Sequence, residues 1–156
     1  MIAVQIPGYG DLKLQHLVLD YNGTIAQDGR LLPGVGEVLK AFAEKLQIHV
    51  VTGDTFGLAA RELDGLPVRL TILPPQAQAE AKRDYVAALE ADRVVAIGNG
   101  ANDHKMLCLA ALGILVLGRE GAAAMSANSA SIVATSITAA LELLQQPKRL
   151  IATLRS

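Results

Sequence analysis

The chain has 156 residues and a mass of 16.4 kDa, and we expect residues 1–156 to form one domain. It is 51% hydrophobic, 19% charged and has a mean hydropathy of +0.35, which excludes a disordered chain, a collagen and a disulfide scaffold. Fourteen basic and fifteen acidic residues give a net charge of −1, so a nucleic acid partner is not expected.

The N-terminal sequence, the lengths of the apolar runs and the single cysteine predict a cytoplasmic protein. Cys108 has no partner for an internal disulfide, and its place among helical core positions predicts a buried side chain rather than a nucleophile. The N-terminus lacks the basic start and long apolar stretch of a signal peptide. No apolar run reaches the roughly 18–20 residues of a membrane helix, so membrane insertion is not expected.

The elements begin with two apolar segments, Ile2–Ile6 and Leu12–Leu19, around the turn sequence Pro7–Gly10. They predict a β-hairpin whose second strand ends at Asp20. Later strands are predicted at Ile48–Val51, Val68–Leu73, Val94–Ile97, Gly113–Leu117 and Ser131–Ala134. Helices are predicted from Val35 to Leu46 and at Phe56–Leu63, Gln76–Ala91, Ala101–Ala111, Gly121–Ala127 and Ile137–Leu144, with a last turn or helix at Lys148–Leu154.

Strands and helices therefore alternate along nearly the whole chain, and several strands are continuous apolar runs. Continuous runs are typical of strands covered on both faces. The pattern predicts an α/β domain with a mainly parallel, doubly wound sheet, whose ligands gather beyond the carboxyl ends of the strands.

Three predicted strands end in polar segments: Asp20–Thr24, Thr52–Asp54 and Gly98–Asp103. Each segment alone is compatible with an ordinary turn or helix cap. Together, Asp20-X-Asn22-Gly23-Thr24, Thr52, Lys82 and Gly98-Asn99-Gly100-X-Asn102-Asp103 resemble the four ordered motifs of the haloacid dehalogenase (HAD) superfamily. The match covers roughly Leu12 to Arg155, and among the branches of the superfamily it looks nearest to the phosphorylation domain of P-type ATPases.

The resemblance implies a Rossmann-like core and Mg²⁺-dependent phosphoryl transfer, and the residue chemistry agrees. Asp20 would attack phosphorus and form an aspartyl phosphate. The phosphate-binding residues would be Gly23, Thr24, Thr52, Gly53 and Lys82, since hydroxyl, ammonium and backbone N–H groups stabilise phosphoryl oxygens. The metal would be held by Asp20, Asp103, Asn99 and the Asn22 carbonyl, because Mg²⁺ prefers oxygen ligands.

Two positions depart from the HAD pattern. Phosphatases of the superfamily usually carry an acid/base Asp where this chain has Asn22, and loss of such help slows catalysis by about 10²–10⁴-fold. Asn99 stands where the first Asp of the fourth motif is usual, which removes one negative charge from the metal site. The Asn22 change suits a slow phosphatase, an enzyme that needs a partner or another base, or a site that has lost turnover. The two changes together suit decay of the site or a weakly held metal.

Other residues near the motifs have simpler interpretations. Arg83, next to Lys82, could take the role of the lysine. Asp54 is interpreted as a cap for the helix that follows it, and His49 and His104 as structural residues, because neither has a His or Cys at metal-ligand spacing.

The intervals from Asp20 to Thr52 and from Thr52 to Lys82 are filled by elements of the core, so no cap domain is expected. The segment Ile25–Leu32 would form at most a small flap. An open site suits a large phosphorylated substrate, such as a phosphoprotein, or a phosphorylated small molecule covered by a second copy of the chain. We therefore expect a phosphatase that acts through Asp20. The alternatives are a non-catalytic phosphate-binding or regulatory module and an accessory protein of a transport ATPase.

Overall fold

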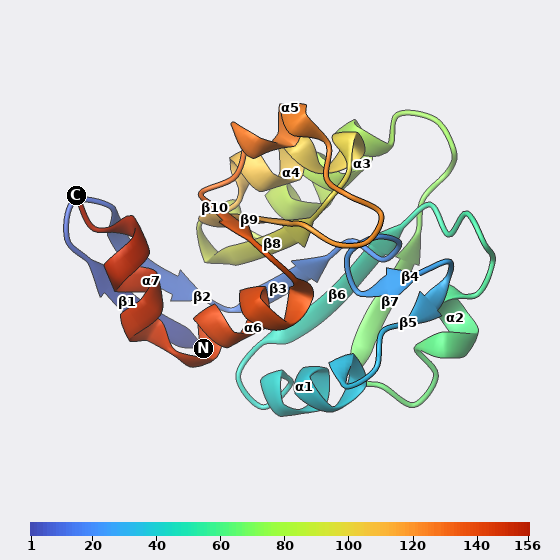
Figure 1. The fold of residues 1–156 in the computed structure, drawn as a ribbon, viewed down its shortest axis with the longest axis horizontal. Coiled ribbons are helices and arrows are strands. Elements are labelled where there is room, and N and C mark those ends of the chain that lie inside the picture. Colours follow the sequence, from blue (N-terminus) through green and yellow to red (C-terminus); the bar gives the residue numbers. More distant parts are fainter.

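The computed structural model describes all 156 residues around a six-stranded, wholly parallel sheet (Figure 1). The strand order is β10-β9-β8-β3-β6-β7, which puts β3 between β8 and β6. The strands are β3 (His16–Leu19), β6 (Gln47–Thr52), β7 (Val68–Ile72), β8 (Val94–Gly98), β9 (Leu112–Val116) and β10 (Ile132–Ala134). The sheet confirms the predicted Rossmann-like α/β fold.

Helices cover both faces of the sheet, and alternate residues of β3 show why. Leu17 and Leu19 belong to one core cluster with α1 and α6, whereas Val18 belongs to a second cluster with α3 and α4. Leu17, Val18 and Leu19 are all buried, so this part of β3 is a continuous apolar run. The helices are α1 (Val35–Phe42), α2 (Ala59–Glu62), α3 (Gln78–Ala88), α4 (His104–Leu109), α5 (Ala124–Ala127), α6 (Ile137–Gln145) and α7 (Pro147–Leu154), with single 3-10 turns at Ala91–Arg93 and Ala101–Asp103.

The predicted N-terminal hairpin is present, but its second strand is shorter than expected. β1 (Ile2–Ile6) pairs antiparallel with β2 (Gly10–Leu14), and β2 ends before β3 enters the main sheet. Gln15 separates the hairpin from the main sheet. Its N–H donates to the Arg93 carbonyl, and its carbonyl accepts from the Gln47 N–H. The hairpin and α7, which packs on β1, form an arm that carries both termini (Figure 1).

The segment after Thr24 forms the predicted flap, a hairpin of β4 (Ala26–Gln27) and β5 (Arg30–Leu31). Asp28 and Gly29 at its tip both have positive φ angles, as a tight hairpin turn requires. The buried Tyr21 hydroxyl donates to the Gly29 carbonyl at 2.9 Å and fixes the tip to the core. The flap and α1 fill the interval between Asp20 and β6, and α2 and β7 fill the next one, so no cap domain is inserted.

Several predicted helices were too long. The helix predicted at Phe56–Leu63 begins only at Ala59, because Gly57 has a positive φ. The one predicted at Gly121–Ala127 begins at Ala124, again after a glycine with positive φ, Gly121. Ala77, in the left-handed region, delays α3 to Gln78.

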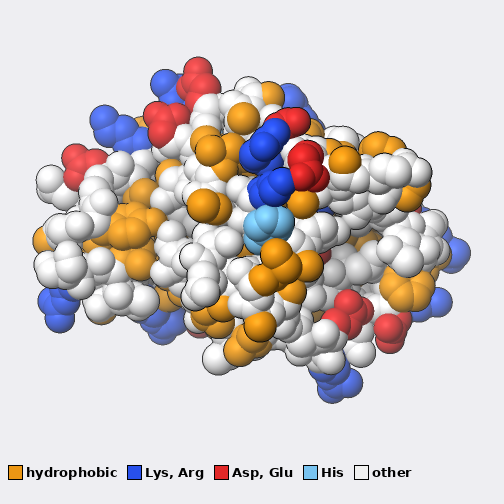
Figure 2. Space-filling model, turned by 90° about the horizontal axis from the view of Figure 1, so that it is seen from above, with side chains coloured by type: hydrophobic (Ala, Val, Ile, Leu, Met, Phe, Trp, Pro, Cys, Tyr) orange, Lys and Arg blue, Asp and Glu red, His pale blue; other side chains and the backbone are white.

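The face formed by α3, α4 and α5 carries acidic and basic side chains close together (Figure 2). Arg83 pairs with Asp84, and Lys105 pairs with Glu80, so neighbouring charges of opposite sign compensate one another. None of the helices has the length and apolar character needed to cross a membrane.

Candidate active site

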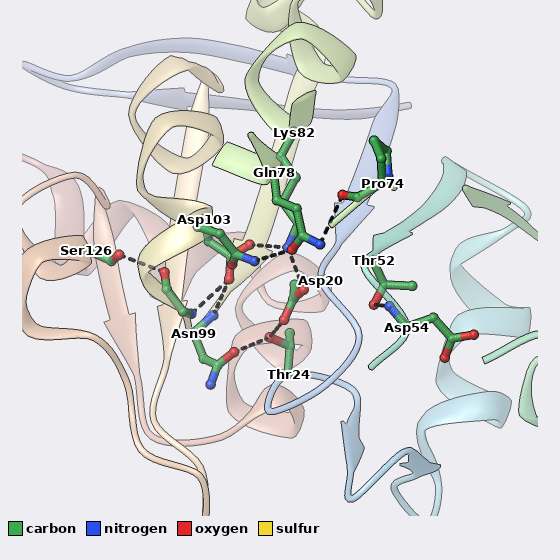
Figure 3. Close-up of polar contacts among 12 residues, drawn as sticks. Asp20, Thr24, Thr52, Asp54, Pro74, Gln78, Lys82, Asn99, Asp103 and Ser126 are labelled. Carbon is green, nitrogen blue, oxygen red and sulfur yellow. Dashed lines mark hydrogen bonds and ion pairs between the residues drawn. The ribbon is translucent and has the colours of Figure 1, made fainter. Parts of the chain in front are cut away.

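The carboxyl ends of β3 and β8 and one face of α3 bring three charged side chains together in the protein interior (Figure 3). Lys82 Nζ donates to Asp20 Oδ1 at 2.6 Å and to Asp103 Oδ1 at 2.7 Å. The relative exposure is 6% for Asp20, 1% for Lys82 and 0% for Asp103. Residues separated by 83 positions in sequence thus share one buried cluster, as the order of the motifs predicts.

The charges of this cluster do not balance. Burial alone would lower the pKa of Lys82, but the carboxylates of Asp20 and Asp103 outweigh burial and raise it. Burial and the neighbouring Asp20 carboxylate raise the pKa of Asp103 to about 6, against the opposing effect of Lys82. One ammonium faces two carboxylates, so the ionised cluster carries one uncompensated negative charge and attracts a cation.

Asp103 also shapes the loop that follows β8. Its Oδ2 accepts from the backbone N–H groups of Asn99 at 3.0 Å and Gly100 at 2.8 Å. A Cβ on Gly98 would lie 2.5 Å from the Asp103 carboxyl, so only glycine allows this approach. The loop sequence is therefore required both for the carboxylate and for the close packing around it.

Thr24 and Asn99 link the two loops on either side of the nucleophile candidate. Thr24 Oγ1 donates to Asp20 Oδ2 at 3.0 Å and lies 3.3 Å from Asn99 Oδ1. Asn99 Nδ2 donates to the Gly121 carbonyl at 3.1 Å. Gly23 has a φ of +79°, and a Cβ there would lie 2.3 Å from Asn99 Nδ2. The backbone N–H groups of Gly23 and Thr24 donate to the Ala26 and Tyr21 carbonyls.

Thr52 lies at the end of β6, the strand next to β3, and is 2% exposed. Its Oγ1 accepts from the Asp54 N–H at 3.0 Å, which leaves the hydroxyl proton free to be donated elsewhere. The structure confirms Asp54 as a cap, since its Oδ1 accepts from the N–H groups of Leu58 and Ala59. Gly53 is packed against Gln78, whose side chain a Cβ would meet at 2.3 Å.

Sequence reasoning missed Gln78, although it lies one helical turn before Lys82. Its Nε2 donates to the Pro74 carbonyl, and its Oε1 accepts from Asn102. The i, i+4 spacing on α3 puts Gln78 and Lys82 on one face and was the available signal. Ser126 was also missed, and it supports the β8 loop by donating to the Gly100 carbonyl at 2.8 Å.

Arg83, His104 and Cys108 were also assigned from the sequence, and none of them contacts Asp20 in the structure. Arg83 is exposed and pairs with Asp84, so Lys82 alone faces Asp20. His104 Nδ1 contacts the Ala101 carbonyl within its own turn. The prediction that Cys108 is buried was wrong: α4 turns Met106 and Leu107 inward and leaves Cys108 exposed.

The oxygen donors of the cluster fit a magnesium ion. No group of three His, Cys, Asp or Glu side chains converges anywhere in the chain, so two carboxylates would be supplemented by amide and carbonyl oxygens. Asn22 Oδ1 is buried and accepts no hydrogen bond. Hard oxygens beside a net negative charge are the ligands that Mg²⁺ prefers, and it commonly completes its shell with water.

The chain is similar to two short proteins of unknown role from Methanocaldococcus jannaschii. One is 48% identical over 63 residues, which are 40% of this chain and 68% of that protein. The other is 44% identical over 39 residues, 25% of this chain and 89% of that protein. No family model matches the chain.

Solved structures share the fold at low sequence identity. The 3-deoxy-D-manno-octulosonate 8-phosphate phosphatase of Moraxella catarrhalis, solved with magnesium, phosphate and KDO, has a TM-score of 0.71 at 17% identity, over 92% of this chain and 94% of that one. The cobalt-bound phosphatase of Haemophilus influenzae has a TM-score of 0.72 at 14% identity with the same coverage. These structures confirm the HAD fold. They do not show the closer resemblance to P-type ATPases, which stays a prediction.

Proposed function

We propose that this chain, which belongs to the same family as the 48% identical Methanocaldococcus jannaschii protein and has the HAD fold, is a Mg²⁺-dependent phosphatase acting through Asp20. The observation that carries the proposal is the contact of Lys82 with both Asp20 and Asp103 at the carboxyl end of the central strand. This is the edge at which ligands of parallel α/β sheets bind.

The reaction begins with attack of the Asp20 carboxylate on the phosphorus of a phosphate monoester. The bond to the ester oxygen breaks, and the alcohol leaves with a proton from water. Water then cleaves the aspartyl phosphate, which restores the Asp20 carboxylate and releases inorganic phosphate. Thr24 holds the second carboxylate oxygen at 3.0 Å and so orients the nucleophile.

Lys82 and Thr52 stabilise the phosphoryl oxygens, because the Lys82 ammonium contacts Asp20 and the Thr52 hydroxyl at the end of β6 has a proton to donate. Gly23 and Gly53 keep the adjacent backbone close to the site. Asp20, Asp103, Asn99 and the Asn22 carbonyl would hold Mg²⁺, which when bound neutralises charge on the phosphoryl group. Net charge favours this ion, since Lys82 leaves one carboxylate uncompensated.

Asn22 sets the expected rate. An amide cannot transfer a proton, so departure of the alcohol and attack by water proceed without help from this position. The amide at Asn22 also suits a second candidate, a module that binds phosphate without turnover. The observation that favours it is Asn99, whose amide is engaged with the Gly121 carbonyl and the Thr24 hydroxyl.

Both candidates act on a phosphorylated partner. Two neighbours in structure are named as phosphatases of a phosphorylated sugar acid, which supports a small phosphorylated molecule over a phosphoprotein. With no cap domain, a second copy of the chain would cover the site. Size-exclusion chromatography with light scattering tests that copy, and a strictly monomeric chain would contradict it.

The test compares the wild type with Asp20→Asn and Asn22→Asp, using Mg²⁺ and acetyl phosphate as substrate. We expect slow release of phosphate by the wild type, none by Asp20→Asn, and a gain of about tenfold or more for Asn22→Asp. Mass spectrometry of the acid-quenched wild-type protein should find the phosphoryl group on Asp20. Arg83→Gln, one residue from Lys82 but exposed, is the matched control and should retain the wild-type rate. Equal rates for the wild type and Asp20→Asn would favour the binding module.

A further inference from the structure

A cavity of about 380 Å³ opens next to the Asp20 cluster and is not used by the reaction described above. Gly23 and Thr24 form one wall, and Thr24 also donates to Asp20, so a single residue separates the cavity from the nucleophile. The flap, the β9–α5 loop and the start of α6 form the other walls. The volume lies in the range of pockets that hold small molecules.

The floor of the cavity is apolar and its rim is polar. Val35, Val116 and Ile137 are buried members of the core cluster and form apolar surface there. Gln27, Thr135 and Thr138 line the same space, and their side chains make no hydrogen bond within the chain. Apolar surface with a few unsatisfied polar groups is the usual composition of a ligand pocket.

The charges of the cavity are not equivalent. Glu120 is already engaged, because its Oε1 accepts from the Asp28 N–H of the flap at 3.3 Å. Arg119 is exposed and makes neither an ion pair nor a hydrogen bond, whereas seven of the other basic side chains form ion pairs. The first turn of α6, a helix of nine residues, opens onto the same space and adds partial positive charge. The cavity therefore offers an unpaired guanidinium to a negative group.

We infer that this cavity binds the leaving group of the substrate and that Arg119 selects phosphate esters carrying a second anionic group. The inference rests on the proposed phosphatase function, since it assigns the organic half of the substrate to a pocket beside Asp20. A planar guanidinium pairs with a carboxylate or a phosphate through two parallel hydrogen bonds. Gln27, Thr135 and Thr138 suit hydroxyl groups between the ester and that anion. The substrate class is a small, hydroxylated phosphate ester with an acidic end.

The kinetic test uses three esters built on one six-carbon polyol: gluconate phosphate, glucitol phosphate and glucitol bisphosphate. They end in a carboxylate, a hydroxyl and a second phosphate, so the series separates the two sources of negative charge. For the wild type, we expect kcat/KM for gluconate phosphate or for glucitol bisphosphate to exceed that for glucitol phosphate by about tenfold. A factor of about ten corresponds to one charged hydrogen bond. In Arg119→Gln this ratio should fall to near one. Arg155→Gln, the same change at another exposed and unpaired arginine, should keep the ratio.

A binding measurement separates failure of the inference from failure of the proposed function. Calorimetry of gluconate phosphate and glucitol bisphosphate on Asp20→Asn should show a Kd about tenfold weaker when Arg119→Gln is added. If the wild type hydrolyses acetyl phosphate but does not distinguish the three esters, the inference is overturned and the phosphatase stands. If neither acetyl phosphate nor any ester is hydrolysed, the phosphatase fails, and calorimetry alone decides the cavity: equal Kd values in the two proteins overturn the inference.

Discussion

Two polar clusters lie at opposite ends of the same strands. One is charged and belongs to the proposed active site, whereas the other is neutral and stabilises the fold. At the carboxyl end of β3, Asp20 meets Lys82 of α3 in a charged cluster. Towards the start of β3, His16 Nδ1 lies 3.2 Å from His49 Nε2 of β6, and His49 Nδ1 lies 2.9 Å from the Tyr85 hydroxyl of α3. Lys82 and Tyr85 are three residues apart on one helix.

The two clusters differ in their charge. The histidine end stays neutral: every contact is satisfied when Tyr85 donates to His49 and His49 donates to His16. The charged end buries three ionised groups with an excess of one negative charge, an arrangement that costs folding free energy unless each group has a partner. Under the proposed function the charged cluster binds a cation and attacks phosphorus, for which a neutral chain of imidazoles has no charge.

The largest effect is expected from Lys82→Met, which removes the only positive charge of the cluster. Asp20 and Asp103 would then face one another, and we expect a loss of about 3–5 kcal/mol in the free energy of unfolding. Urea unfolding followed by circular dichroism measures the loss. Phosphate release should also be abolished.

Asp20→Asn sharpens that prediction, because it breaks the same contact from the other side. It leaves Lys82 with Asp103, a balanced pair, so the free energy of unfolding should change by no more than about 1 kcal/mol. Arg83→Gln should be within about 0.5 kcal/mol of the wild type. If Lys82→Met is as stable as Asp20→Asn, the cluster is not the closed arrangement of charges described above.

The charged end could be predicted from the sequence, whereas the neutral end could not. Asp20, Thr52 and Asp103 each come after an apolar strand in the sequence. Their meeting at the carboxyl edge of the sheet can therefore be predicted from the sequence alone. His16 and His49 meet only because of the register of β3 on β6, where His16 pairs with Gln47 and Val18 with His49. No local pattern fixes that register.

The orientation of helix faces and the position of irregular turns also could not be predicted from the sequence. Lys82 and Arg83 are adjacent basic residues on a polar helix, and only the packing of α3 on the sheet, which buries Lys82 and exposes Arg83, decides which of them faces Asp20. Helical spacing predicted a buried Cys108, but α4 buries Met106 and Leu107 and leaves Cys108 exposed. The site loops were predicted by motif, while their links through Gln78 and Ser126 depend on packing.

The next effect is the acid sensitivity of the neutral end. Burial, His16 and Arg69 of β7 lower the pKa of His49 to about 4, from 6.5, and burial also lowers that of His16, which lies near Arg69, Glu90 and Arg93. The unfolded chain therefore binds more protons than the folded one between these two values, so stability is full above pH 6.5 and falls as the pH drops towards 4.

At about 1.4 kcal/mol per pKa unit, and allowing for partial access of water, His49 contributes a loss of about 2 kcal/mol over that window. Unfolding in urea at a series of pH values measures the slope. His49→Gln keeps a polar side chain but cannot titrate, so its slope should be shallower although the variant is less stable. Equal slopes for the two proteins would show that the imidazole is not held neutral.

The smallest effect is expected from Tyr85→Phe, which removes one hydroxyl from the same helix that carries Lys82. His49 Nδ1 loses its partner at 2.9 Å, and the free energy of unfolding should fall by about 1 kcal/mol, the value of one neutral hydrogen bond. Phosphate release from acetyl phosphate should equal that of the wild type, because Tyr85 belongs to the neutral end. Lys82→Met and Tyr85→Phe thus change a buried and a partly buried contact of α3, yet only the first should stop turnover. A loss of activity in Tyr85→Phe at unchanged stability would mean that the two ends are coupled through the helix, and the division between them would fail.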